Sequence, residues 1–338
     1  MDRKNIVMYN KDKIAVIGSG SWATAIAKML MLNTSRINWY FRDPESIRYM
    51  QQFNHNPKYL SSVNFDTGRI NFYSDLKDII SDSEILVFAI PSAFLKQVLE
   101  GADFDLGDKL IVSAIKGIIP EDNITIAEFF NRYYDVPFDR IGIITGPCHA
   151  EEVALERLSF LTIASKTEKK GKLIASCLES HFIRTIVTSD IYGTEYAAVL
   201  KNIFSIAAGI CHGLAYGDNF QAVLISNAIR EIKRFLDHTY PSRRSINSSA
   251  YLGDLLVTAY SQFSRNRAFG VMIGKGYSVR SAILELNMVA EGYYATRCIK
   301  EINKHYNVNI PIIDSVYNIL YEGIAPSIEI RLLTEELA

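Results

Sequence analysis

The chain has 338 residues, enough for about two domains, with 49% hydrophobic and 22% charged residues and a formal net charge of −1. A charge so close to zero excludes a chain-wide attraction to nucleic acid or to an anionic membrane surface. The apolar runs are too short to span a bilayer, and the polar segment 1–12 lacks the apolar core of a signal peptide. We therefore expect a cytoplasmic protein without a membrane span or a nucleic-acid partner.

The cysteine and histidine residues give no support for a metal site. The six histidines include no HExxH pair, and no two cysteines have a CxxC spacing. We therefore expect reduced thiols, as in a reducing compartment, and no bound metal. The cysteines are Cys148, Cys177, Cys211 and Cys298.

Short β-branched runs that predict strands alternate with amphipathic stretches that predict helices in the first half of the chain. The predicted strands are 13–17, 37–41, 69–73, 85–89, 110–113, 141–145, 158–164 and 183–188. The predicted helices between them include 93–100, 123–133 and 168–178. This alternation implies crossover connections and an α/β fold with a doubly wound, mostly parallel sheet.

The first predicted strand runs directly into a glycine-rich turn and a helix. Gly18, Gly20 and Ala23 form a GxGxxA pattern between the strand 13–17 and the helical run 24–32. In this pattern the first glycine permits the tight turn, the second lets the backbone approach a pyrophosphate, and the small third residue keeps helix and strand close. The free N–H groups at the helix start favour phosphate. The sequence therefore predicts a dinucleotide-binding site.

The end of the second predicted strand bears on which dinucleotide is bound. An acidic side chain there would bind the ribose 2′-hydroxyl of NAD. The strand is followed by Arg42 and Asp43; Arg42 can pair with the 2′-phosphate of NADP, whereas Asp43 can serve NAD or, because Pro44 follows it, cap the next helix. We favour NADP or dual use.

Two further strand ends carry candidate site residues. Lys116 follows the strand 110–113, and Gly146 and Cys148 follow the strand 141–145. The loops at the carboxyl ends of strands face the ligand crevice of an open α/β sheet. This placement puts Lys116 near the reactive end of the dinucleotide, although a solvated loop lysine is the plain alternative.

The pattern changes near residue 189, beyond which strand signals nearly vanish. We therefore predict a dinucleotide-binding domain over 1–189 and a helical domain over 190–338, packed closely because no low-complexity linker separates them. The predicted helices of the second domain are 195–212, 219–240, 249–261, 279–286, 292–305 and 312–321.

Lys201 stands inside the apolar helix 195–212. A lone lysine is costly to bury unless it has a partner or a task, although it can also extend to the surface. A buried lysine beside another cation has a lowered pKa and can exchange protons near neutrality, as alcohol–ketone redox chemistry requires. Asp254 can orient Lys201, and Asn202 can bind a substrate hydroxyl or carbonyl.

The segment 253–270, GDLLVTAYSQFSRNRAFG, combines groups suited to two ends of one small ligand. The fork of Arg265, flanked by the hydroxyl of Ser264 and the amide of Asn266, suits a phosphate group. The carboxylate of Asp254 and the hydroxyl of Thr258 suit another part of the ligand. Taken alone, however, this segment is better explained as a solvated helix end with ordinary surface arginines.

These motifs together resemble the NAD(P)-dependent glycerol-3-phosphate dehydrogenases, above all the bacterial form. The matching segments span residues 13 to 292 in the order of that family; they are GSGSWATAIA at 18–27, AIPS at 89–92, SAIKGI at 113–118, TGPCHAEEVA at 145–154, LKNIFSIAAGICHGL at 200–214, GDLLVT at 253–258, SRNRAFG at 264–270 and VAEG at 289–292. The resemblance implies an oxidoreductase that interconverts sn-glycerol 3-phosphate and dihydroxyacetone phosphate and supplies glycerol 3-phosphate for phospholipid synthesis. It also implies an N-terminal Rossmann domain, an all-helical C-terminal domain like that of 6-phosphogluconate dehydrogenase, and a homodimer.

The resemblance also implies roles for individual residues. Lys201 is expected to be the proton acceptor, with Lys116 and Asp254 beside it in the reaction. The expected substrate contacts are Lys116, Gly146, Cys148, Lys201, Asn202, Asp254, Thr258, Ser264, Arg265 and Asn266. The expected cofactor contacts are Gly18, Gly20, Ser21, Trp22, Arg42, Lys116, Ala150, Arg265, Val289 and Glu291.

Three positions depart from the family pattern. Cys148 stands where Ser or Thr is usual, and a thiol is the weaker hydrogen-bond donor. His149 stands where Phe is common, and 193–199 lacks the Gly-Gly pair that is more often found there.

Two other functions compete with this hypothesis. A related dehydrogenase acting on 6-phosphogluconate, a 3-hydroxy acid or ketopantoate would share the two-domain plan, but the SRNR cluster after GDLLVT argues against it. A non-catalytic dinucleotide sensor would need the glycine pattern but not Lys116, Lys201 and Asp254 together.

Overall fold

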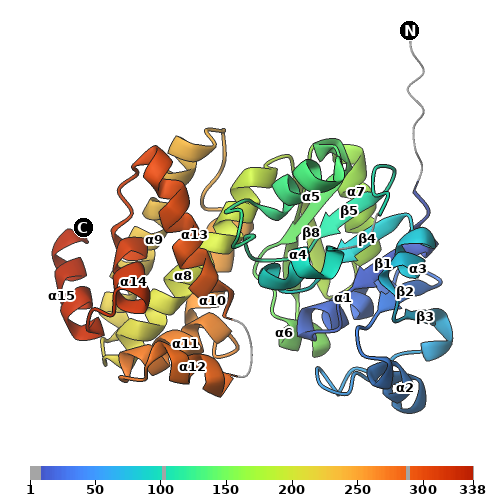
Figure 1. The fold of residues 1–338 in the computed structure, drawn as a ribbon, viewed down its shortest axis with the longest axis horizontal. Coiled ribbons are helices and arrows are strands. Elements are labelled where there is room, and N and C mark those ends of the chain that lie inside the picture. The colour runs from blue at the N-terminus through green and yellow to red at the C-terminus, as the bar shows by residue number, and fades with distance from the viewer. Residues whose placement is uncertain (1–8, 101–103, 287–289, 338) are drawn as a thin grey trace, which may run out of the picture.

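A computed structural model describes residues 9–100, 104–286 and 290–337. One part of the molecule is a sheet with helices on both sides, and the other is an assembly of helices (Figure 1). The long helix α8 (Ile191–Gly213) follows the last strand and begins the helical part.

The sheet has eight strands in the order β3-β2-β1-β4-β5-β6-β7-β8. Neighbouring strands run parallel except for β6 and β7, which are antiparallel. The strands are β1 (Ile14–Ile17), β2 (Ile37–Tyr40), β3 (Ile70–Tyr73), β4 (Ile85–Phe88), β5 (Leu110–Ser113), β6 (Ile141–Thr145), β7 (Ser159–Ser165) and β8 (Ile183–Thr188). The chain reverses its direction across the sheet between β1 and β4, and such a switch point is where open α/β sheets bind their ligands.

Helices cover both faces of the sheet at its centre, where β1, β4, β5 and β6 are buried along their whole length. Ile14 and Val16 of β1 pack with α1 and α7, whereas Ala15 and Ile17 pack on the other face with α3, α4 and α5. The helices of this part are α1 (Ser21–Met31), α2 (Pro44–Phe53), α3 (Leu76–Ser81), α4 (Ser92–Leu99), α5 (Ile126–Tyr134), α6 (Ala150–Ala154) and α7 (Glu168–Leu178).

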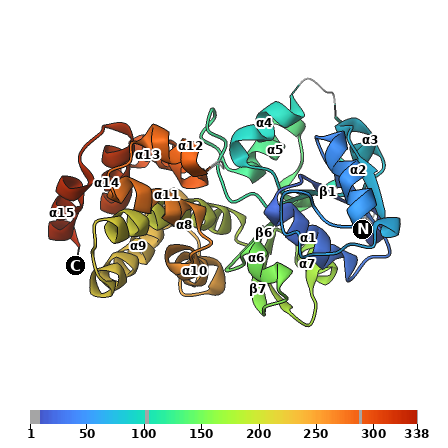
Figure 2. The same cartoon turned by 90° about the horizontal axis from the view of Figure 1, so that it is seen from below.

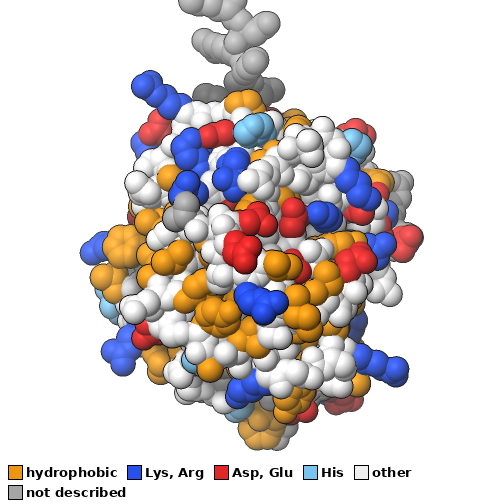
Figure 3. All heavy atoms as spheres, turned by 90° about the vertical axis from the view of Figure 1, so that its left-hand side faces the viewer, with side chains coloured by type: hydrophobic (Ala, Val, Ile, Leu, Met, Phe, Trp, Pro, Cys, Tyr) orange, Lys and Arg blue, Asp and Glu red, His pale blue; other side chains and the backbone are white. Residues whose placement is uncertain are grey.

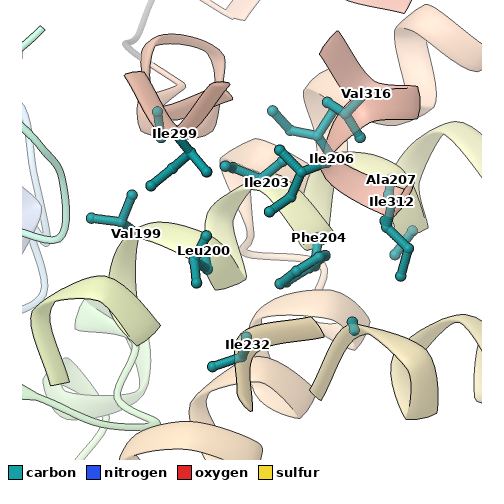
Figure 4. Close-up of a cluster of buried hydrophobic side chains, with 14 of the residues drawn as sticks. Val199, Leu200, Ile203, Phe204, Ile206, Ala207, Ile232, Ile299, Ile312 and Val316 are labelled. Atoms are coloured by element: carbon teal, nitrogen blue, oxygen red, sulfur yellow. The ribbon is translucent and has the colours of Figure 1, made fainter. Parts of the chain in front are cut away.

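The helical part is built around α8, of which nearly every residue is buried. Its apolar side chains, including Leu200, Ile203 and Phe204, contact residues of the surrounding helices on several sides (Figure 4). The helices that follow are α9 (Asp218–Thr239), a π-helical turn at Ser249–Gly253, α10 (Asp254–Tyr260), α11 (Arg265–Gly274), α12 (Val279–Leu286), α13 (Glu291–Tyr306), α14 (Pro311–Tyr321) and α15 (Pro326–Glu336).

Helices α8 and α11 cross with their backbones in contact. A Cβ atom added at Gly209 would lie 2.2 Å from the carbonyl oxygen of Arg267, and one added at Gly270 would lie 2.2 Å from that of Ile206. Gly213 and Gly274 form the same kind of contact one turn further along. Only glycine permits this approach, which fixes the start of α11 relative to the middle of α8.

The predicted fold class is confirmed: a doubly wound, mostly parallel sheet is followed by helices alone. The domain boundary at residue 189 falls between β8 and α8 and stays a prediction. The predicted helix 249–261 begins as a π-helical turn. The segment after it, which could also have been a helix end, forms the helix α11. Within the described ranges, no helix is long and apolar enough to cross a membrane.

Candidate active site

The glycine-rich turn after β1 has the geometry that its sequence predicts. Gly18 has a φ of +129°, and a Cβ there would lie 2.5 Å from the carbonyl oxygen of Ala89, so no larger residue fits. Gly20 caps the N-terminus of α1 and would direct a Cβ into open space. Open space beside free helix N–H groups is what a bound pyrophosphate requires.

The side chains around this turn also fit a dinucleotide. The indole Nε1 of Trp22 is buried without a hydrogen-bond partner among the described residues. The ammonium group of Lys116 lies 5.2 Å from the centre of the Trp22 ring, which brings a positive charge to the start of α1. Ser21 is the first residue of α1, and Ala150 begins α6, which packs against α1. An orphaned indole donor and a nearby cation fit a cofactor with phosphate and amide groups.

Arg42 and Asp43 separate in their roles at the end of β2. The Asp43 carboxylate accepts hydrogen bonds from Glu45 N at 3.1 Å and Ser46 Oγ at 2.9 Å, so it caps α2. Arg42 is exposed and forms no ion pair with any residue that the structure describes. Of the two, Arg42 is the side chain left free for a 2′-phosphate.

Lys116 and Asn202 connect the sheet to α8. Lys116 Nζ donates to the carbonyl oxygen of Gly146 at 3.3 Å, and the carbonyl oxygen of Lys116 accepts from Asn202 Nδ2 at 2.8 Å. The loops after β5 and β6 thereby meet the residue next to Lys201. Figure 2 shows β6 and α6 beside α8 and α10 at this junction.

Lys201 is buried and paired. Its side chain is 5% exposed, its Nζ donates to Asp254 Oδ1 at 2.5 Å and to Thr258 Oγ1 at 3.1 Å, and the side chain of Asp254 is 1% exposed. The second carboxylate oxygen, Asp254 Oδ2, is buried with no hydrogen-bond partner among the described residues. A buried polar atom without a partner is costly, so its presence here points to a ligand.

Burial lowers the pKa of Lys201 to about 8. The charge of Asp254 opposes this effect, and the nearby ammonium group of Lys116 lowers the pKa further. The group therefore titrates close to neutral pH, as a proton donor and acceptor should.

The start of α11 supplies the candidate anion site. Arg265 is exposed at the first position of the helix, and its charge acts on the carboxyl group of Glu291. The Oδ1 atom of Asn266 accepts from Gly292 N at 3.0 Å, which ties α11 to α13. Ser264 caps α11 through Arg267 N at 3.2 Å and shares a hydrogen bond with Ser205 Oγ at 2.8 Å. A helix N-terminus that carries a free guanidinium favours a phosphate.

Glu291 joins the two parts of the molecule. Its carboxylate oxygens accept from Ser92 N at 2.9 Å and from Ser92 Oγ at 2.5 Å, so it caps α4 from the start of α13. Burial raises the pKa of Glu291, whereas the two hydrogen bonds from Ser92 and the charge of Arg265 lower it. Val289, another predicted cofactor contact, lies outside the described residues.

Cys148 and His149 lie on the Lys201 side of the site. Burial raises the pKa of the Cys148 thiol to about 11, although Lys116 acts against it. Burial lowers the pKa of His149 to about 4, and Lys116 and Lys201 act in the same direction. Both side chains are therefore neutral near pH 7.

The structure brings most of the predicted residues together but not all of them. Lys116, Cys148, Lys201, Asp254 and Thr258 form one cluster. Arg267 lines a surface pocket of about 400 Å³ together with Ser264, His212 and Lys275.

Three supporting residues were missed from the sequence. Trp39 Nε1 donates to the carbonyl oxygen of Gly18 at 2.8 Å, and Asn56 Nδ2 donates to that of Ser19 at 3.0 Å, so both hold the glycine-rich turn. Ser205 Oγ donates to the carbonyl oxygen of Thr258 at 2.9 Å and joins α8, α10 and the start of α11. Ser205 could have been found from the sequence, because it is a polar residue within the apolar run of α8. Nothing in the sequence singles out Asn56.

The arrangement can bind a dinucleotide at the glycine-rich turn and hold an anion at the start of α11. Between them, Lys201 can exchange a proton with a bound oxygen atom. Within the described ranges, no group of His, Cys, Asp or Glu is placed to hold a metal ion.

Comparisons with known proteins agree with this arrangement. A family model described as NAD-dependent glycerol-3-phosphate dehydrogenase N-terminus matches residues 13–171, and the C-terminus model of that family matches 190–331. The chain is 32% identical over 315 residues to glycerol-3-phosphate dehydrogenase [NAD(P)+] of Bacillus subtilis, covering 92% of this chain and 90% of the relative. It is 32% identical over 326 residues to the protein of that name from Pseudomonas paraeruginosa, covering 96% and 95%.

A solved structure gives the same picture. The crystal structure of glycerol-3-phosphate dehydrogenase from Coxiella burnetii superposes with a TM-score of 0.87 at 27% identity. The match covers 95% of this chain and 98% of that one.

Proposed function

The chain belongs to the NAD-dependent glycerol-3-phosphate dehydrogenase family, and from this we propose that it interconverts sn-glycerol 3-phosphate and dihydroxyacetone phosphate with NAD(P). The observation that carries the proposal is the buried Lys201–Asp254 pair, 2.5 Å apart, between a dinucleotide turn and a cationic helix start. The product of the reduction, glycerol 3-phosphate, is the backbone precursor for phospholipid synthesis.

Lys201 handles the proton in this mechanism. The bound cofactor supplies hydride exchange with C2 of the substrate. During reduction the Lys201 ammonium group hydrogen-bonds the C2 carbonyl oxygen and gives it a proton as negative charge develops there; in oxidation the neutral amine takes the proton from the C2 hydroxyl. Asp254 and Thr258 hold the amine in place, and burial together with the positive charge of Lys116 keeps the pKa of Lys201 low enough for both directions.

Other residues hold the substrate across the site. We assign the phosphate to Arg265, Asn266 and Ser264 at the start of α11, because a guanidinium and helix N–H groups favour a dianion. Lys116, Asn202, Gly146 and Cys148 line the opposite side. Cys148 is buried and neutral, so it offers only a weak hydrogen bond where a hydroxyl would offer a stronger one.

For the cofactor we propose NADP, or use of both dinucleotides. Arg42 is exposed, while Asp43 is occupied as the cap of α2, so the end of β2 offers a positive charge rather than a free carboxylate. Gly18, Gly20, Ser21, Trp22 and Ala150 would hold the remainder of the cofactor, and Glu291 and Val289 would complete its site from the helical part.

We further propose a cytoplasmic homodimer with a domain boundary at residue 189. All four cysteines are buried and free, as is usual in a reducing compartment. Hydrophobic side chains gather on the end face of the helical part (Figure 3), where α15 exposes Ile328 and Leu332. Such a patch suits contact with a second copy.

The function is tested by measuring NADPH and NADH oxidation in parallel, with dihydroxyacetone phosphate, ketopantoate and a 3-keto acid as substrates. We expect turnover with dihydroxyacetone phosphate alone. Oxidation of the dinucleotide only with ketopantoate or the 3-keto acid would refute the assignment. Cofactor binding without any turnover would indicate a sensor.

A further inference from the structure

His149 has an unexplained polar atom at the active site. It lies directly before α6, in the loop that follows β6, and its ring centre is 6.3 Å from that of Phe263. Its Nε2 atom is buried and has no hydrogen-bond partner among the described residues. A buried nitrogen without a hydrogen-bond partner is costly, so the fold alone does not account for this histidine.

The surroundings of His149 are those of the proposed reaction. The charged groups that act on its ring are Lys116, Lys201 and Asp254, and the backbone of Val257 on α10 is hydrogen-bonded to the ring. Burial, together with these two cations, keeps the imidazole neutral at neutral pH. A neutral imidazole carries one donor and one acceptor nitrogen, so it suits an uncharged hydroxyl better than a phosphate.

The substrate has one polar group without an assigned partner. Its C2 oxygen lies with Lys201 and its phosphate with Arg265, and these leave the C1 hydroxyl at the end remote from the phosphate. We infer that Nε2 of His149 hydrogen-bonds the C1 hydroxyl of the substrate and makes His149 a specificity-determining residue. This inference rests on the proposed function and adds to it a reason for preferring a hydroxymethyl ketone over a methyl ketone.

Removing the C1 hydroxyl from the substrate should then lower kcat/KM strongly only in a protein that contains His149. With hydroxyacetone phosphate, which has a methyl group in place of the hydroxymethyl group, Nε2 would stay buried and unpaired. We expect the wild-type kcat/KM to fall about 10- to 100-fold relative to dihydroxyacetone phosphate, because each 1.4 kcal/mol corresponds to a factor of ten.

The experiment compares the wild type with His149→Phe and His149→Gln on both ketones. For His149→Phe, which has no polar atom to leave unpaired, we expect the ratio of the two kcat/KM values to fall below about threefold. For His149→Gln, whose amide can bind a hydroxyl, we expect part of the wild-type discrimination to return. The KM for NADPH should be the same in all three forms. A variant that merely distorted the fold would change this KM as well.

The outcomes separate this inference from the proposed function. If the wild type reduces dihydroxyacetone phosphate but all three forms discriminate equally, the role of His149 is refuted and the function stands. If the wild type does not reduce dihydroxyacetone phosphate at all, the proposed function itself fails.

Discussion

At the scale of single residues, the proposed chemistry depends on whether the Lys201 amine is protonated. The Lys201 side chain is 5% exposed, and both burial and Lys116 favour the neutral amine, whereas Asp254 favours the cation. The net effect is a pKa of about 8, at which the group can give a proton in one direction of the proposed reaction and accept one in the other.

This balance predicts opposite pH profiles for the two directions. Reduction needs the protonated lysine, so its kcat/KM should be level up to the pKa of about 8 and then fall about tenfold per pH unit. Oxidation needs the neutral amine, so its kcat/KM should rise toward pH 8 and then level off. Initial rates in both directions between about pH 7 and pH 10 measure this.

Lys201→Met is the control for these profiles. It should lower turnover by about 10²- to 10⁴-fold and remove the pH dependence while NADPH still binds. Profiles that keep their shape in this variant would assign the titration to another group.

A second residue-scale prediction concerns Arg42. Replacing it with Glu puts a negative charge where the 2′-phosphate is proposed to lie. We expect the KM for NADPH to rise about 10- to 100-fold, with a much smaller change for NADH, because a charge-assisted hydrogen bond is lost and a repulsion is gained. Steady-state kinetics with both cofactors measure this, and equal effects on the two would refute the NADP preference.

At the scale of elements, the crossing of α8 and α11 sets the distance between Lys201 and Arg265, the two residues proposed to hold opposite ends of the substrate. α8 carries Lys201 and α11 begins with Arg265, and glycine contacts hold the two helices backbone to backbone. A side chain in this contact would push the proposed phosphate site away from the proposed proton donor.

Gly209→Ala tests the crossing. Its Cβ would lie 2.2 Å from the carbonyl oxygen of Arg267, so the helices must separate. We expect a loss of about 1–3 kcal/mol in the free energy of unfolding, together with a higher KM for dihydroxyacetone phosphate. Urea denaturation and steady-state kinetics measure the two effects.

Gly217→Ala is the matched control, because a Cβ at Gly217 meets nothing within 4 Å and its φ is −79°. It should leave the KM unchanged. If Gly209→Ala behaves like this control, the close crossing does not position the site.

At the scale of the whole molecule, buried carboxyl groups link the sheet part to the helical part. Glu195 of α8 accepts from Ala127 N of α5 at 3.1 Å, as Glu291 of α13 does from Ser92 of α4. Burial raises the pKa of Glu195 from 4.5 to about 8, although the hydrogen bonds from α5 oppose this. Burial therefore keeps Glu195 protonated in the folded protein up to about pH 8.

The raised pKa of Glu195 predicts that the free energy of unfolding falls as the pH rises. Between about pH 4.5 and 8 the unfolded chain has lost the proton of Glu195 while the folded protein keeps it, so the free energy of unfolding decreases as the pH increases. Glu195→Gln, which keeps a hydrogen-bond acceptor without a titrating group, should flatten this decrease. Denaturant unfolding at pH 5 and about pH 8 measures it.

Glu335, which is exposed, provides the control for Glu195→Gln, because its replacement by Gln also removes one carboxylate. Glu335→Gln should keep the wild-type slope of stability against pH. A Glu195→Gln variant with that same slope would show that Glu195 does not titrate as described.

The sequence by itself determined the fold class and the chemical vocabulary of the site. Hydrophobic periodicity predicted the strands and most helices, because an element buried on one or both faces must carry that pattern. The turn at Gly18 and Gly20 was predictable because its backbone geometry admits few residues, and Lys201 stood out because a charge in an apolar helix needs a reason.

Tertiary structure alone decided how these pieces cooperate. Asn56 supports the glycine-rich turn, Glu195 and Glu291 join the two parts, and His149 reaches the catalytic cluster, all through contacts between segments far apart in the chain. The pKa of Lys201 likewise depends on Lys116 and Asp254, which only folding brings to it. Local propensity and spacing carry no record of such contacts, because they arise from the packing of one element against another.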